Sequence, residues 1–438
     1  MREITISEYG YIGWDKEHED DNFVSYRDLE ENEFKELKNY WENNADTFKV
    51  FTIHNKNCLK ATNYVGVIQT DSVSIEILPK TYTNEEAKNT QRKIFIEMLK
   101  SLLNVNEVQI NQANLSTTDS KNIYEMFIML FIQSIDKLIH KGIKSDYVLR
   151  EGNQFFLKGK LKFNQHIKQN YIHKERFYVE TDEYLQDRVA NRLLKSTIAL
   201  LMKKTNNFDN KRKLRQQLFI FDEVQLSNNH KIDFTKVKKH RGMEHYNLSL
   251  RFAEVFLLHK SFTSLRGKDN VFALLFPMEK VFENYMEFVL NNSKDELGID
   301  AVMVNGGKNE YLLNSGQCKI ARLQPDYLLK MKGQKDIVTD AKWKLYETKE
   351  DDSKDCVSVN IASNDAYQIF SYLHFYDCQN RAYLFVPETE EFKEKIEFIY
   401  LAEQNPKLPF EKKRIKVIPI NLEKVINSYH KLDSKLWS

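Results

Sequence analysis

The alternation of hydrophobic and polar residues predicts that the chain begins with β-strands. From residue 73 to residue 77, valine or isoleucine alternates with serine or glutamate. This is the period of a strand with one buried face, and Pro79 ends it because proline cannot continue a strand ladder. Similar runs predict strands at 48–53 and 59–69, and a helical pattern predicts one helix at 31–43. We therefore expect residues 1–83 to form a β-rich N-terminal domain.

A helical pattern dominates residues 84–263. The most apolar stretch, residues 122–140, is interrupted by charged residues such as Glu125 and Asp136. These charges favour a buried bundle helix over a membrane span. Further elements are predicted at helices 87–103, 182–204, 209–221 and 245–261, with two short strands in 147–163 on either side of Glu151-Gly152-Asn153. This second region is therefore expected to be mainly helical.

The polar residues 264–270 are the best candidate for a domain boundary. After them, the pattern predicts a helix at 276–292, a hairpin around Asn305-Gly306-Gly307, a second hairpin at 322–346, a helix at 365–376 and strands at 381–386 and 414–419. A helix, several strands, a helix and further strands are typical of a small α/β domain with a mixed central sheet. We expect residues 271–438 to fold in this way.

The second of these hairpins carries the most informative chemistry. Two short apolar runs flank Gly333, and a pairing symmetric about this glycine places Asp326 directly opposite Asp340. Opposite residues of an antiparallel pair have Cβ atoms about 5 Å apart, so both carboxylates could share one cation. Lys342 lies two residues after Asp340 and therefore on the same face. Mg²⁺ suits such an oxygen site, with Mn²⁺ as a substitute.

Three further side chains are candidates near this pair. Gln368 and Tyr372 are four residues apart and share one face of the predicted helix that follows the hairpin. Glu283, on the helix that precedes it, could supply a third carboxylate. Each also has a structural alternative: Tyr372 in the core, Gln368 at the surface, and Glu283 as a solvated helix residue. The sequence leaves these alternatives open.

Composition restricts the class of protein. The chain has 438 residues, 42% hydrophobic and 29% charged, which is enough to bury the cores of two or three domains. Its four cysteines are too far apart to form paired metal ligands, so we expect reduced thiols in a cytoplasmic protein. The acidic N-terminal stretch lacks the apolar core of a signal peptide, and no apolar run is long enough to cross a membrane.

Charge and motif searches narrow the chemistry further. Net charge is only +2, and the C-terminal region is mildly acidic. Basic residues gather instead between residues 158 and 215, where each cluster could be a solvated face or part of a DNA or partner surface. Those singled out are Lys158, Lys160, Lys203, Lys211, Arg212 and Arg215, together with Lys344 in the hairpin region. No phosphate-binding loop, zinc-protease motif or serine-nucleophile motif is present, so we expect no nucleotide to bind this chain.

These motifs resemble those of a known nuclease family. Gln324-Pro325-Asp326 followed by Asp340-Ala341-Lys342 resembles the PD-(D/E)xK signature, and residues 368–372 resemble the Q-x-x-x-Y element of its RecB-like branch. The remaining motifs resemble the McrC family, the nuclease subunits of McrBC- and LlaJI-type restriction systems that depend on 5-methylcytosine. They lie at residues 63–68, 75–80, 157–161, 281–283, 340–344 and 366–372.

The resemblance implies a function and a partner. It implies an Mg²⁺-dependent endonuclease in which Asp326 and Asp340 hold the metal with the Ala341 backbone carbonyl, Lys342 orients the attacking water, and Gln368 and Tyr372 position the DNA. It also implies that a stalk binds and stimulates a McrB-like AAA+ GTPase hexamer. The substrate would be modified double-stranded DNA, with two complexes pairing to cut both strands. The alternatives are a non-catalytic activator of an NTPase ring and a stand-alone RecB-like nuclease.

Overall fold

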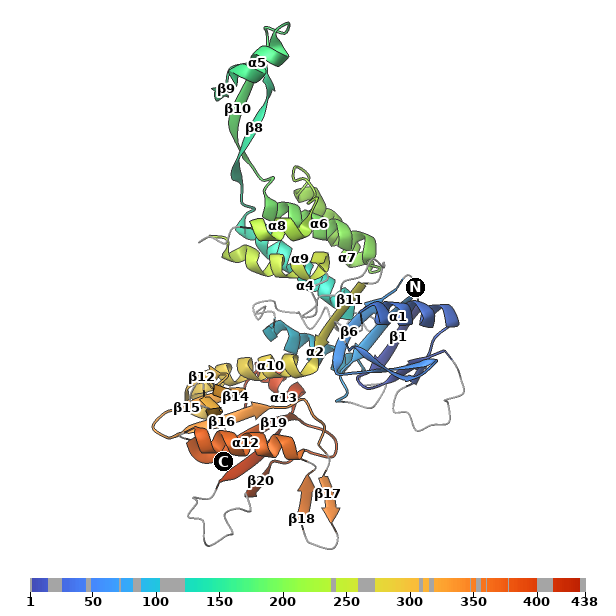
Figure 1. Cartoon of the computed structure of the whole chain (residues 1–438), viewed down its shortest axis with the longest axis vertical. Coiled ribbons are helices and arrows are strands. Elements are labelled where there is room, and N and C mark those ends of the chain that lie inside the picture. Colours follow the sequence, from blue (N-terminus) through green and yellow to red (C-terminus); the bar gives the residue numbers. More distant parts are fainter. Residues whose placement is uncertain are drawn as a thin grey trace. The chain divides into compact units, whose positions relative to one another are not determined.

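The computed structural model divides the chain into two compact units, Met1–Asn106 with Arg266–Ser438 and Glu107–Leu265. Figure 1 shows the course of the chain. Residues 1–83 and 271–438, which we expected to be separate domains, both belong to the first unit, because a strand near residue 275 pairs with one near residue 66. The structure describes residues 2–14, 26–44, 49–70, 72–81, 88–102, 123–237, 242–258, 272–306, 310–314, 319–346, 348–351, 356–359, 361–376, 378–399 and 413–433. The predicted boundary at 264–270 lies outside these residues.

Two small sheets form the N-terminal part of the first unit. Strand β1 (Arg2–Ser7) runs parallel to β7 (Val73–Leu78), and the sheet continues through β6 (Tyr64–Gln69) to β11 (Phe272–Pro277). The second sheet has the order β3 (Tyr26–Asp28), β2 (Tyr11–Gly13), β5 (Cys58–Ala61) and β4 (Phe51–Asn55). Helix α1 (Glu31–Asn44) confirms the predicted helix at 31–43. The single strand predicted at 59–69 is instead two strands, β5 and β6.

Strand β7 differs from the prediction in its burial. Every residue of β7 is buried, so both of its faces are covered rather than one. Helix α2 (Lys88–Leu102) packs against the strand, and its Arg92 places two guanidinium nitrogens 2.5–3.1 Å from the Glu76 carboxylate. The glutamate in the alternating pattern is therefore a buried partner of an arginine and not a solvent-facing residue.

The second unit contains the predicted helical bundle. Its longest helix, α4 (Ile123–Lys141), contacts α9 (Asn247–Leu258) through edge-to-face aromatic pairs, including Phe131 with Phe256 at 6.0 Å. The other helices of this bundle are α6 (Val189–Lys204), α7 (Phe208–Ile220) and α8 (His230–Lys236), with a 3-10 turn η3 (Glu244–Tyr246). Among the described residues, no helix combines the length and the apolar character needed to span a membrane.

An arm of paired strands extends from this bundle and was not predicted correctly. Strand β8 (Asp146–Gln154) runs straight through Glu151-Gly152-Asn153, where we expected a break, and pairs along its length with β10 (Phe177–Leu185). The helix predicted from residue 182 begins only at residue 189. The arm ends in β9 (Lys160–Leu161) and α5 (Phe163–Asn170). Pairing with a distant strand outweighed the local turn preference of a Glu-Gly-Asn sequence.

The C-terminal part of the first unit is built on a six-stranded mixed sheet. Its strand order is β12 (Ile299–Val304), β15 (Tyr327–Met331), β16 (Asp336–Ala341), β19 (Cys378–Pro387), β21 (Arg414–Ile420) and β20 (Ile396–Ile399). The pairs β16–β19 and β19–β21 are parallel and the others antiparallel, which confirms the predicted mixed α/β architecture. Helix α10 (Met278–Asn292) packs on β12 and β16, and α12 (Ser363–Phe375) on β16 and β19.

Smaller elements complete this part of the chain. They are α11 (Lys294–Leu297), α13 (Leu422–Asn427), and the two-stranded ribbons β13 (Glu310–Asn314) with β14 (Lys319–Leu323) and β17 (Thr348–Asp351) with β18 (Cys356–Val359). The hairpin predicted around Asn305 was wrong, because β12 pairs with β15 and not with β13. The Asn305 amide donates to the Asp326 carbonyl at 2.9 Å, so the chain turns there without returning alongside β12.

Candidate active site

The central hairpin has the predicted register. Tyr327 lies opposite Thr339, and Leu329 lies opposite Ile337, so the pairing of β15 with β16 is symmetric about Gly333. Gly333 has φ +69°, a left-handed conformation that glycine adopts without strain. The next pair outward from Tyr327 and Thr339 is Asp326 and Asp340. Local turn chemistry therefore brings the two acids to adjacent strands.

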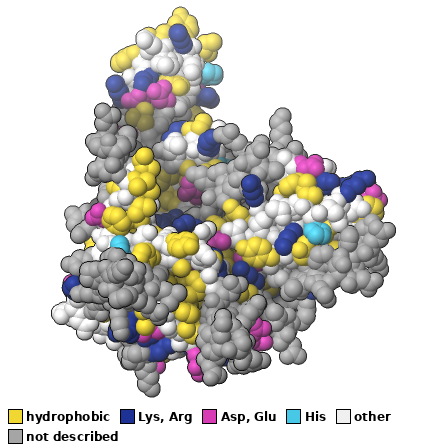
Figure 2. Space-filling model, turned by 60° about the horizontal axis from the view of Figure 1, so that its bottom comes forward, with side chains coloured by type: hydrophobic (Ala, Val, Ile, Leu, Met, Phe, Trp, Pro, Cys, Tyr) yellow, Lys and Arg dark blue, Asp and Glu magenta, His cyan; other side chains and the backbone are white. Residues whose placement is uncertain are grey.

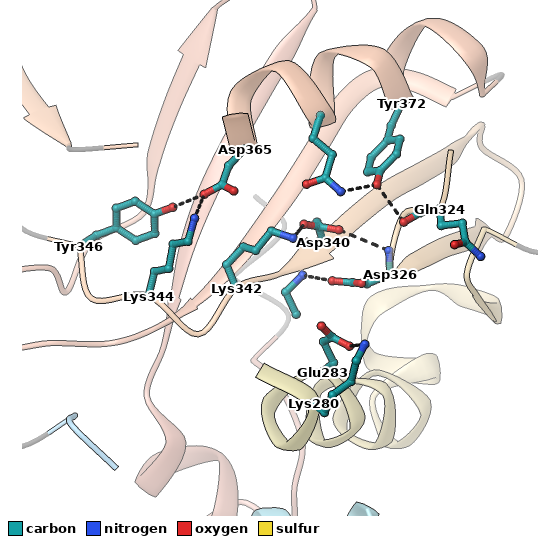
Figure 3. Close-up of polar contacts among 12 residues, drawn as sticks. Lys280, Glu283, Gln324, Asp326, Asp340, Lys342, Lys344, Tyr346, Asp365 and Tyr372 are labelled. Carbon is teal, nitrogen blue, oxygen red and sulfur yellow. Dashed lines mark hydrogen bonds and ion pairs between the residues drawn. The ribbon is translucent and has the colours of Figure 1, made fainter. Parts of the chain in front are cut away.

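Each aspartate carboxylate accepts a hydrogen bond from a backbone amide at or next to the other aspartate. Asp326 Oδ2 accepts a hydrogen bond from the Ala341 amide at 2.8 Å, and Asp340 Oδ1 accepts one from the Asp326 amide at 3.4 Å. Asp340 is buried and Asp326 is half-buried. Figure 3 shows both carboxylates between helices α12 and α10. The structure thus fixes both side chains in one small region that is largely shielded from solvent.

Lys342 joins the aspartates on this face. Its Nζ lies 2.5 Å from Asp340 Oδ2 (Figure 3), and its backbone amide donates to the Phe385 carbonyl at 2.9 Å. Burial alone would lower the pKa of this amine. The charges of Asp340, Asp326 and Asp365, with the contact to Asp340, outweigh burial and raise the pKa of Lys342. The side chain therefore stays an ammonium next to the acid pair.

The electrostatics of the pair suit a cation. Burial, followed by the charge of Asp340, raises the pKa of Asp326 from 3.8 to about 8, so the pair retains a proton near neutral pH. Asp340 Oδ2 is buried and accepts no well-aligned hydrogen bond. Two carboxylates that repel each other, with the Lys342 ammonium beside one of them, fit a hard divalent cation that would replace the retained proton.

Glu283 lies near the pair but is engaged elsewhere. Its carboxylate pairs with Lys280 of the same helix at 2.6 Å, and its backbone carbonyl accepts a hydrogen bond from the Tyr327 hydroxyl. Its charge contributes to the raised pKa of Asp326. Within the part of the chain that the structure describes, no three His, Cys, Asp or Glu side chains are grouped as a metal cluster. The structure therefore does not assemble Glu283 with the aspartates, and its role as a ligand stays a prediction.

Helix α12 fastens the segment that leads into Asp326. The Tyr372 hydroxyl accepts a hydrogen bond from Gln368 Nε2 at 2.6 Å and donates one to the Gln324 carbonyl at 2.8 Å. Tyr372 is also buried in the core beneath the helix. Tyr372 therefore packs in the core and also holds the residue two positions before Asp326, and its role as a site residue stays a prediction.

Several contacts around the site were not anticipated from the sequence. Lys344, considered a DNA or partner contact, pairs at 2.5 Å with the buried Asp365 carboxylate, which Tyr346 also approaches at 3.4 Å. The Trp343 indole donates to Glu8 Oε2 at 2.9 Å, across 335 residues of sequence. A lysine at 344 and an acid at the start of a helix are weak signals, and nothing local links Trp343 to Glu8.

The remaining basic candidates belong to the second unit, whereas the acid pair belongs to the first. All are exposed. They are Lys158 and Lys160 on the arm, Lys203 at the end of α6, and Lys211, Arg212 and Arg215 on α7. Arg212 lies 3.5 Å from Asp209, and the pair is solvent-exposed, so little of its charge is neutralised. Their role in binding DNA or a partner stays a prediction.

Comparisons with known proteins bear on the fold and the family of the chain. A chain of the Thermococcus gammatolerans assembly of McrB AAA+ hexamers with bound McrC is similar in fold, with a TM-score of 0.64 at 20% identity over 98% of this chain and 100% of that one. A second structure, the cryo-EM McrBC complex of the same organism, matches with a TM-score of 0.47 and 23% identity over 66% of this chain and 87% of its own. No curated protein sequence matches. The family model of the McrBC 5-methylcytosine restriction system component matches residues 59–387, which is most of the chain. The chain therefore belongs to that family.

Proposed function

We propose that this chain is the nuclease subunit of an McrBC-like restriction system and hydrolyses phosphodiester bonds of modified double-stranded DNA in an Mg²⁺-dependent reaction. The observation that carries the proposal is the convergence of Asp326, Asp340 and Lys342 at the end of two neighbouring strands. Two carboxylates and an amine in this order on a mixed sheet flanked by helices match the pattern of a PD-(D/E)xK nuclease domain. Family membership supports the same activity.

The residues of the site divide the chemistry among them. Asp326 and Asp340 would hold Mg²⁺, or Mn²⁺ in its place, with the Ala341 carbonyl as a further ligand. When bound, such an ion polarises the scissile phosphate and lowers the pKa of a water molecule. Lys342, kept charged beside Asp340, would hold the attacking water and offset the negative charge that develops on the phosphate. Because the acid pair is largely shielded from solvent, the interactions of the ion and of Lys342 with the phosphate would be stronger than in water.

Gln368 and Tyr372 have a supporting part in this scheme. The Tyr372 hydroxyl holds the Gln324 carbonyl and so fixes the approach to Asp326. The Gln368 amide is oriented by the same hydroxyl, which leaves its carbonyl oxygen as a polar group beside the site. We propose that this pair places the DNA backbone relative to the acids.

A nucleotide-hydrolysing partner is part of the proposal. The similar structure contains McrB AAA+ hexamers with bound McrC in a tetradecameric assembly. We infer that this chain likewise binds an AAA+ GTPase hexamer, because it has no phosphate-binding loop of its own. Pairing of two such complexes would bring two active sites to one DNA molecule, as a double-strand cut requires.

The arm of the second unit is the surface best suited to this partner. Several large apolar side chains at the tip of the arm are exposed to solvent, and this part of the molecule is at the top of Figure 2. They are Phe155, Phe156, Leu157, Phe163, Ile167, Tyr171 and Ile172. A cluster of this many exposed apolar side chains, with lysines among them, is typical of a protein-binding surface. We propose that the arm contacts the GTPase ring.

The decisive test is removal of one acid of the pair. Asp340→Ala is expected to abolish cleavage of 5-methylcytosine-containing plasmid DNA by the full chain with its AAA+ partner, GTP and Mg²⁺. Its matched control is Asp336→Ala, an aspartate on the same strand that pairs with Lys330 away from the site. Asp340→Ala should still bind the partner and stimulate its GTPase. Wild-type cleavage by Asp340→Ala would discard the site.

The two alternatives give different results in the same experiment. A non-catalytic activator would stimulate the GTPase, but neither wild-type nor Asp336→Ala would cut DNA. A stand-alone nuclease would cut DNA without GTP or the partner. The acid pair with its ammonium favours the catalytic reading, and the arm favours dependence on a partner.

A further inference from the structure

The backbone that carries Lys342 leaves its strand immediately after the site. Strand β16 ends at Ala341, and the amide of Lys342 makes the last hydrogen bond to β19, at 2.9 Å from the Phe385 carbonyl. From this point the segment 342–346 is not held by sheet pairing. The position of the Lys342 ammonium therefore depends on what anchors the residues that follow it.

The first anchor is Trp343, whose side chain is buried. Its ring centroid lies 5.4 Å from that of Phe282 in helix α10. Its indole N–H donates to Glu8 Oε2 at 2.9 Å. The rings meet at an interplanar angle of 54°, and this tilted contact together with the indole hydrogen bond restricts the orientation of the Trp343 ring.

Glu8 is itself held rigidly. It directly follows β1, its backbone amide donates to the Leu78 carbonyl at 2.8 Å, and Oε2 also accepts from the Lys80 amide at 3.1 Å. The side chain is 3% exposed, and its second oxygen, Oε1, is buried without a hydrogen-bond partner. Burying a carboxyl with one oxygen unsatisfied is unfavourable, and an apolar side chain would cover Trp343 at lower cost. Packing alone therefore does not explain an acid here.

The second anchor is Lys344, on the other side of the segment. Its ammonium lies 2.5 Å from Asp365 at the start of α12. Consecutive residues after Lys342 are thus tied to opposite sides of the sheet, Trp343 to the N-terminal strands and Lys344 to the helix that carries Gln368 and Tyr372. A segment tied at both residues can hold the preceding lysine in one place.

We propose that Glu8 is a positioning residue for Lys342, acting through the indole of Trp343. The inference rests on the nuclease function proposed above and deepens it, because it makes the N-terminal sheet part of the frame of the active site. The N-terminal sheet would then set the position of Lys342. Residues 1–106 would be needed for cleavage even if the GTPase partner were bound by another part of the chain.

The experiment uses the full chain with its AAA+ partner, GTP, Mg²⁺ and 5-methylcytosine-containing plasmid DNA. Trp343→Phe keeps the ring against Phe282 and removes the N–H donor, and Glu8→Ala removes the acceptor. Both should lower the single-turnover cleavage rate about 10- to 100-fold with little change in the DNA concentration that gives half-maximal rate. Glu8→Gln keeps an acceptor oxygen and should recover most of the rate. The matched control, Trp41→Phe, removes an indole hydrogen bond to the Phe51 carbonyl, 2.8 Å long, elsewhere in the same unit.

A second readout does not depend on nuclease activity. Acetylation of Lys342 by acetic anhydride, measured by mass spectrometry on folded protein, should become several-fold faster in Trp343→Phe and Glu8→Ala and stay unchanged in Trp41→Phe. The positioning role would be overturned if Lys342 acetylation were unchanged in both Glu8→Ala and Trp343→Phe. It would also be overturned if both variants cleaved DNA at the wild-type rate. If the wild-type protein never cuts DNA but Lys342 acetylation responds as expected, the nuclease function fails and the positioning contact stands.

Discussion

The acid pair should make this protein less stable than a neutral version of itself. Asp326→Asn keeps the shape of the side chain and an oxygen to accept the Ala341 amide, but removes one of two adjacent charges. The wild-type pKa rises from 3.8 to about 8 because of burial and Asp340. Each pKa unit corresponds to about 1.4 kcal/mol, so the shift sets an upper bound of about 6 kcal/mol on the destabilisation.

The sign and the pH window follow from the direction of the shift. Between about pH 4 and pH 8 the folded protein keeps a proton on Asp326 that the unfolded chain has lost, so wild-type stability falls as pH rises through this window. Asparagine has no proton to lose. Because Asp326 is only half-buried, we expect an effect smaller than the upper bound. The free energy of unfolding of Asp326→Asn should exceed that of wild-type by about 1–3 kcal/mol more at pH 8 than at pH 5.

Thermal unfolding in EDTA at pH 5, 6, 7 and 8 measures this advantage. The Tm of Asp326→Asn should exceed that of wild-type by about 2–6 °C more at pH 8 than at pH 5. The control is Asp295→Asn, an exposed aspartate 3.1 Å from Lys332, for which the change should stay below about 0.5 kcal/mol at every pH. Adding Mg²⁺ should raise the wild-type Tm and not that of Asp326→Asn. A lower Tm for Asp326→Asn at pH 8, or an advantage independent of pH, would refute the reasoning.

Two further changes test the supports of the site and of the arm. Tyr372→Phe removes the hydroxyl between Gln368 and the Gln324 carbonyl, and should lower stability by about 1–2 kcal/mol in thermal unfolding and slow cleavage. Gly159→Ala places a Cβ 2.3 Å from a backbone carbonyl of the neighbouring strand at φ +79°, so it should distort the arm and weaken co-purification with the GTPase ring. Gly152→Ala, in the same arm with open space around it, is its control and should bind normally. Equal binding by both glycine variants would exclude the arm as the contact, and a Tyr372→Phe protein as stable as wild-type would remove the proposed tie.

What the sequence by itself determined is local. The hairpin around Gly333 could be predicted because its register depends on one turn and on strand alternation within the seventeen residues from Asp326 to Lys342. These two residues and Asp340 therefore reach one face without any help from the rest of the chain. Helix α12 was likewise predictable, since its apolar period is contained in its own sequence and places Gln368 and Tyr372 on one face. The mixed sheet followed from the order of such elements.

What only the tertiary structure decided depends on partners far away in the chain. Strand β11 exists because it pairs with β6, about 200 residues earlier, and β8 continues through a turn-like sequence because β10 lies beside it. The contact of Glu8 with Trp343 has the same origin. The local sequence sets which conformations a segment can adopt. Burial and pairing with distant residues then select one of them. The sequence of the segment alone does not show which conformation is selected.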